Sequence, residues 1–76
     1  MNSRIQLSPE IHSGKPCVSG TRITVQNVLE LVREGIPSDT IIRDYCPDLK
    51  VEDIKACVQY AMDVVQTEEI HVGSAS

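Results

Sequence analysis

The chain has 76 residues, a formal net charge of −4, and no phenylalanine or tryptophan. At this length we expect one small domain, residues 1–76, with too little chain for a separate catalytic lobe. The acidic total disfavours a general nucleic-acid coat, because non-specific DNA binding depends on lysine and arginine at the phosphates. A thin core of aliphatic residues also needs support, so the sequence predicts a homodimer or a tight complex with a partner.

The sequence predicts a cytoplasmic protein with no membrane partner. Its longest apolar runs are three residues, far short of the roughly 20 needed to span a bilayer. Polar residues follow Met1 where a secretory signal would have an apolar core. The cysteines Cys17, Cys46 and Cys57 are odd in number and widely spaced, which predicts buried thiols in a reducing compartment.

Residues 1–24 have no helical period and are predicted to form a β and turn element. Proline and glycine divide this segment into short apolar pieces, a pattern typical of short strands and tight turns. The pieces lie around Ile5–Leu7, Cys17–Val18 and Arg22–Ile23, and the residues between them include Pro9, Gly14, Pro16 and Gly20. Gly14 and Gly20 are expected to supply the positive-φ positions of a hairpin-like element.

Residues 25–67 change to the three- and four-residue spacing of amphipathic helices, which predicts a tri-helical bundle. The first helix is expected to follow an N-cap at Thr24 and to end at Gly35, in the C′ position. A second, short helix is expected to start with Ser38 as its N-cap and to end before Pro47.

The third predicted helix runs from about Val51 to Gln66 and has the clearest period. Its apolar stripe consists of Ile54, Cys57, Val58, Ala61, Met62 and Val65, and we expect all of these except Met62 to be buried on one face. Glu52 and Asp53 lie in the first turn, where carboxylates are stabilised by the positive end of the helix dipole. This structural role is enough to explain both residues, so we assign them no catalytic role. Asp48 is a candidate N-cap that would start the helix slightly earlier. Residues 68–76 are predicted to be a flexible tail.

We predict no catalytic residue, no metal site and no cofactor. Gly14 and Lys15 resemble part of a phosphate-binding loop, but the upstream glycine and the following hydroxyl residue of that motif are both replaced by proline. His12 and Cys17 are too few to hold zinc, which needs four ligands at close pair spacing. No nucleophile constellation is recognisable. These patterns favour a binding module over an enzyme.

The segment from Ile36 to Tyr60 places a short helix, a turn and a longer helix in succession, which resembles a helix-turn-helix. The longer helix opens with two carboxylates, which DNA phosphates would repel. Contacts to promoter DNA are therefore expected from cations elsewhere. The candidates are Lys15, Arg22 and Arg43.

Several short motifs occur together along most of the chain. They are Gly14-Lys15-Pro16, Gly20-Thr21-Arg22-Ile23, Gly35-Ile36-Pro37-Ser38, Pro47-Asp48-Leu49 and Asp53-Ile54-Lys55-Ala56. As a set, from about Ile5 to Ala61, they resemble the small bacterial family called domain of unknown function 433. The resemblance implies a mainly α fold, a three-helix homeodomain-like (helix-turn-helix) bundle with a short N-terminal β element. It also implies a VapB-like antitoxin whose partner is a PIN-like ribonuclease toxin.

The expected mechanism is occlusion of the nuclease site. A PIN-like site holds its metal on carboxylates, and an arginine or lysine from the partner can pair with them and displace the metal. The candidates for the inserted side chain are Arg4, Lys15 and Arg22, and Arg43 is a further candidate for partner binding. Two alternatives remain open: a helix-turn-helix transcription regulator that binds promoter DNA, and a purely structural dimerisation module.

Overall fold

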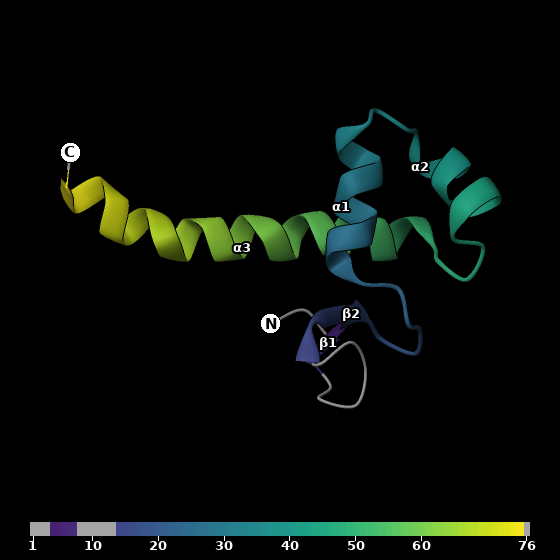
Figure 1. Ribbon diagram of the computed structural model, residues 1–76, viewed down its shortest axis with the longest axis horizontal. Coiled ribbons are helices and arrows are strands. Elements are labelled where there is room, and N and C mark those ends of the chain that lie inside the picture. Colours follow the sequence, from purple (N-terminus) through teal and green to yellow (C-terminus); the bar gives the residue numbers. More distant parts are fainter. Residues whose placement is uncertain (1–3, 8–13, 76) are drawn as a thin grey trace.

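The computed structural model describes residues 4–7 and 14–75, with side chains described up to residue 67. In chain order it has β1 (Ile5–Leu7), β2 (Pro16–Val18), α1 (Val25–Arg33), α2 (Ser38–Thr40), η2 (Ile41–Tyr45) and α3 (Val51–Ala75). The predicted fold class is confirmed: the chain is mainly α, with three helical segments and a short β element before them (Figure 1). Pro9, expected in a turn, and His12, considered and rejected as a metal ligand, lie outside the described residues.

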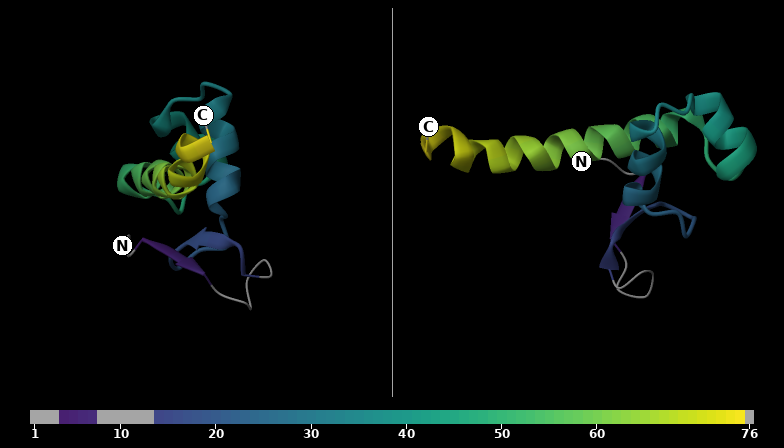
Figure 2. Two further views of the ribbon diagram at one scale, coloured as in Figure 1. Left: turned by 90° about the vertical axis from the view of Figure 1, so that its left-hand side faces the viewer. Right: turned by 45° about the horizontal axis from the view of Figure 1, so that its top comes forward.

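The β element is the antiparallel hairpin that the sequence predicts. Ile5 pairs with Val18 and Leu7 with Pro16. Val18 is 1 % exposed and belongs to the core cluster, so this strand forms one side of the core. Figure 2 shows the hairpin beneath the end of α1 where that helix begins. The hairpin therefore sets the starting position of α1.

The first helix begins and ends at the predicted residues. The side-chain oxygen of Thr24 accepts the backbone N–H of Asn27 at 3.1 Å, which satisfies one of the free donors at the helix start. Gly35 follows the helix with a φ of 82°, a conformation that favours glycine at C′. The prediction for Ser38 is wrong. Ser38 is already the first residue of α2, because Pro37 holds the extended position before it at φ −61° and makes no side-chain cap.

The second helical segment changes its winding midway. α2 continues directly into η2, a π-helical turn in which the backbone N–H of Cys46 donates to the carbonyl oxygen of Ile41 at 2.7 Å. The segment ends before Pro47, as predicted. Ile41 and Cys46 are both buried, and Leu49 in the connection to α3 is buried beside them. The short connection is thus anchored in the core rather than held only by its ends.

The third helix is longer than predicted. It runs to Ala75, nine residues past the expected end at Gln66, so most of the segment expected as a tail is helical. No proline occurs after Pro47, so the sequence has no strong helix breaker in this segment. Figure 1 shows α1 crossing α3 near its start, while the remainder of α3 extends away from the domain. We call residues 61–75 the overhang.

The predicted apolar stripe of α3 is only partly buried. Of the five residues expected to be buried, two are buried (Ile54 and Cys57), two are half-buried (Val58 and Ala61) and one is exposed (Val65). Met62, the sixth member of the stripe, is exposed as well. The predicted burial is therefore correct for Ile54 and Cys57, only partial for Val58 and Ala61, and wrong for Val65. The physical reason is that α1 has nine residues and α3 has 25, so α1 covers only the first turns of the stripe.

Candidate functional site

The four candidate cations lie in two groups at opposite ends of α1. Arg4, Lys15 and Arg22 belong to the hairpin and its turns, at the start of α1. Arg43 belongs to η2, which follows α2 beyond the other end of α1 (Figure 1). All four residues are exposed. The structure therefore does not bring Arg43 together with the hairpin cations.

Arg22 lies in a turn that is fixed by hydrogen bonds. The backbone N–H and the hydroxyl of Thr21 both donate to the carbonyl oxygen of Val18, at 3.0 and 2.9 Å. The same hydroxyl oxygen accepts the N–H of Ile23 at 3.0 Å. Gly20 has a φ of 81°, and a Cβ placed on it would meet no atom within 4 Å, so backbone conformation rather than space requires glycine there. The turn presents Arg22 from a preorganised backbone.

Lys15 is positioned by the start of β2. The preceding residue, Gly14, has a φ of 84°, which confirms a second positive-φ position in the hairpin. The thiol of Cys17 donates to the carbonyl oxygen of Lys15 at 3.2 Å. Because Cys17 is fully buried, this contact joins the exposed lysine's backbone to the core.

Arg4 has a role inside the fold. Its Nη1 donates to Oδ1 of Asp53 at 2.9 Å, and Oδ2 of the same carboxylate accepts the backbone N–H of Lys50 at 2.9 Å. A carboxylate in the first turn that accepts the N–H of the residue before the helix is half of a capping box. Lys50 thus occupies the N-cap position, and the prediction of a cap at Asp48 is wrong. Asp53 is 8 % exposed, so it links the hairpin to α3 from a nearly buried position.

Arg43 forms a local pair with its neighbour. Its Nε and Nη2 donate to the two carboxylate oxygens of Asp44 at 3.1 and 3.3 Å. The hydrogen bond from Arg43 lowers the pKa of Asp44, and the same bond raises the pKa of Arg43. Both side chains are more than half exposed, and such surface pairs contribute little to stability.

The three cysteines are free and buried, as predicted. Burial raises the pKa of Cys57 to about 11 and also raises the pKa of Cys46. Since the thiolate is the nucleophile and the metal ligand, the raised pKa makes each of these two thiols less reactive at neutral pH than an exposed cysteine. Within residues 4–7 and 14–67, no group of three histidine, cysteine or acidic side chains is placed to hold a metal ion. In that same part of the chain, no helix is long and apolar enough to cross a membrane.

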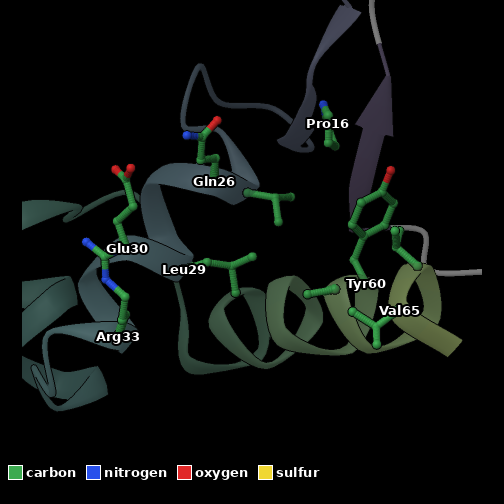
Figure 3. Close-up of a pocket in the computed structure, with 10 residues that line it drawn as sticks. Pro16, Gln26, Leu29, Glu30, Arg33, Tyr60 and Val65 are labelled. Carbon is green, nitrogen blue, oxygen red and sulfur yellow. The ribbon is translucent and has the colours of Figure 1, made fainter. Parts of the chain in front are cut away.

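An apolar groove of about 500 Å³ lies between α1 and α3. Figure 3 shows Leu29 of α1 and Tyr60 and Val65 of α3 facing it, with Glu30 and Arg33 at its α1 edge. Sequence reasoning missed this groove, because it assigned the outer part of the α3 stripe to the core. The signal that could have revealed it was the length of the third periodic segment relative to the first.

Comparison with known proteins identifies related sequences and a related fold. A family model described as protein of unknown function (DUF433) matches residues 5–61. The crystal structure of a DUF433 member from Anabaena variabilis has a TM-score of 0.73 and 24 % sequence identity, over 92 % of this chain and 68 % of that chain. At this identity the likeness shows the fold alone. A search of curated proteins finds no match.

Proposed function

This chain belongs to the DUF433 family, and from that premise we propose that it is an antitoxin-like binding module that neutralises a PIN-like ribonuclease toxin by protein–protein contact. The observation that most supports the proposal is the hairpin, which holds two exposed cations, Lys15 and Arg22, on hydrogen-bonded backbone. A preorganised element loses less conformational entropy on binding than a mobile one. The hairpin therefore suits insertion into a partner's site.

The proposed chemistry is charge pairing at the nuclease's metal-binding carboxylates. A guanidinium can donate two parallel hydrogen bonds to a carboxylate, so Arg22 can hold such a group with defined geometry. A carboxylate engaged in this way is a poorer ligand for the metal that the nuclease needs. We leave Arg4 out of the inserting set, because withdrawing it from Asp53 would leave a nearly buried carboxylate without its cation.

A growth assay tests this proposal when the chain is co-expressed with a PIN-like nuclease encoded beside it. Arg22→Glu and Lys15→Glu are each expected to reduce protection, because a reversed charge repels the carboxylates it should pair with. Arg43→Glu is the matched control, since Arg43 is also exposed but lies at the other end of α1. Circular dichroism verifies that each variant is folded. The proposal is wrong if folded Arg22→Glu and Lys15→Glu protect as well as the parent.

A helix-turn-helix regulator is the second candidate, because the fold has the required succession of α2, a short connection and α3. The charge of α3 opposes it: residues 51–67 contain three acidic residues and one lysine, and phosphates repel such a surface. Under this alternative, promoter DNA binding would fall steeply with salt, and both Arg22→Glu and Arg43→Glu would weaken it without any effect on a toxin.

A further inference from the structure

A series of hydrogen bonds connects the start of α3 to the turn of residues 18–23, which carries Arg22. In the first bond, Nη1 of Arg4 donates to Oδ1 of Asp53 at 2.9 Å. In the second, the backbone N–H of Ser19 donates to the carbonyl oxygen of Arg4 at 2.7 Å. The side chain and the main chain of one residue, Arg4, therefore join α3 to this turn.

The α3 end of this connection has a fixed orientation. Asp53 is nearly buried, and its second carboxylate oxygen accepts the backbone N–H of Lys50 at 2.9 Å. Arg4 reaches this carboxylate from a two-stranded hairpin whose strands have three residues each. Such a hairpin is only marginally stable by itself. A bond to a carboxylate that α3 holds in place therefore restrains the end of the hairpin at Arg4.

The 18–23 turn is shaped by its own bonds and anchored on its inner side. The backbone N–H of Val18 donates to the carbonyl oxygen of Ile23 at 2.9 Å, and Val18 is buried in the core. Ser19, the next residue, is exposed, so the core does not hold it. Its bond to Arg4 ties the outer side of the turn to α3.

The strand register separates the two exposed cations of the hairpin. Leu7 pairs with Pro16 at one end of the two strands, and Lys15 directly precedes that pair. Arg4 lies beyond the opposite end, beside the turn that carries Arg22. A restraint at Arg4 therefore acts on the orientation of Arg22, whereas the position of Lys15 is set independently by the start of β2.

We infer that Arg4 and Asp53 are positioning residues for partner binding: their ion pair holds the 18–23 turn against α3 and so orients Arg22 toward the carboxylates of the nuclease. The part of the inference that concerns the nuclease rests on the proposed function. A cation on a restrained turn loses less conformational freedom on binding, which raises affinity. Arg4 then acts through Arg22 and makes no contact of its own with the partner.

Backbone order parameters of the purified full chain, measured by NMR, test the turn without a nuclease. Arg4→Gln and Asp53→Asn both break the ion pair. In each variant, the order parameters of the Ser19 and Arg22 amides should fall from about 0.85 toward about 0.6, while the Lys15 amide keeps its parent value. Loss of global stability alone would not give this pattern, because order parameters report motion within the folded state. Parent-like order at Ser19 and Arg22 in either variant would overturn the inference.

Inhibition of a purified PIN-like nuclease encoded beside the chain tests the link to the partner. The Arg4 side chain is 45 % exposed, and an ion pair of this kind changes an equilibrium by no more than about fivefold. Arg4→Gln, Asp53→Asn and the double variant should each raise the concentration for half inhibition by the same factor, about threefold, because all three lose one ion pair. With Arg22 already replaced by alanine, Arg4→Gln should have no further effect. With Lys15 replaced by alanine, the effect of Arg4→Gln should remain.

Glu52→Gln is the matched control, because it removes the neighbouring, exposed carboxylate of the same helical turn, and it should inhibit like the parent. Weaker inhibition by Arg4→Gln but not by Asp53→Asn would mean that Arg4 contacts the nuclease itself, and the inference would be wrong. Additive losses from Arg4→Gln and Arg22→Ala would contradict it as well. If the folded parent fails to inhibit while both variants lose order at Ser19, the proposed function is refuted and the restraint on the turn stands.

Discussion

Replacing Asp53 with alanine should destabilise the domain by about 2 kcal/mol. The change removes the acceptor for the Lys50 N–H, a capping interaction of about 1 kcal/mol. It also removes the pair with Arg4, whose side chain is 45 % exposed, so that pair contributes no more than about 1 kcal/mol. Loss of a carboxylate at the positive end of α3 adds a few tenths of a kcal/mol. A domain of this length is stable by only about 4 to 11 kcal/mol.

Urea unfolding followed by circular dichroism measures this loss. With a slope of about 1 kcal/mol per molar urea, the midpoint should fall by about 2 M. Asp53→Asn should lose about half as much, because its amide oxygen can still accept the Lys50 N–H. The double-mutant cycle with Arg4→Ala isolates the ion pair, and its coupling energy should shrink at high salt. A midpoint within 0.3 M of the parent for Asp53→Ala, or strict additivity with Arg4→Ala, would refute the structural role assigned to this carboxylate.

Three further predictions concern stability. Ile54→Ala should lower the unfolding free energy by about 2 to 5 kcal/mol because it opens a cavity in the core. Val51→Ala should change that free energy by less than about 0.5 kcal/mol, and comparable losses for the two variants would contradict the burial described for α3. Gly20→Ala should cost about 1 kcal/mol through its positive φ alone, and a neutral result in chemical denaturation would count against the turn. Burial raises the pKa of Cys57 from 9.0 to about 11 in the folded chain, so the thiol of the unfolded chain ionises first, and the unfolding free energy should fall between pH 9 and 11 by up to about 2 to 3 kcal/mol. Cys57→Ala should show a shallower fall with pH. If the parent and Cys57→Ala lose stability in parallel, the raised pKa of Cys57 is contradicted.

The features that sequence predicts correctly depend on near neighbours. Thr24 caps a helix through a residue three positions away, and Gly20 and Gly35 adopt conformations that their own lack of a Cβ permits. Local rules are enough for such positions. The pairing of the two strands follows as well, because a short segment with turn residues between two apolar pieces favours a hairpin.

The features that sequence misses depend on distant parts of the chain. Arg4 and Asp53 are 49 residues apart, and no periodicity relates them, so the sequence alone places Arg4 among the candidate partner-binding cations. The helical period of the third segment is real, but its burial depends on where α1 ends. A helical period shows which residues share a face of the helix, but it does not show whether another element covers that face.

The candidate site is predicted in the same uneven way. The exposure of Lys15 and Arg22 follows from their position beside turn glycines, which usually lie at the surface. The groove between α1 and α3 forms because the two helices cross. The sequence does not show that crossing, so the groove becomes visible only in the folded structure.

Inhibition of RNA cleavage by a purified PIN-like nuclease tests the central claim most directly. The nuclease is titrated with the folded chain at a fixed magnesium concentration, and cleavage of a labelled RNA is followed. We predict that cleavage stops near one chain per nuclease site, and that the double variant Lys15→Glu with Arg22→Glu requires a large excess to reach the same inhibition. Full cleavage in the presence of excess folded parent, or equal inhibition by the parent and the double variant, would contradict the account.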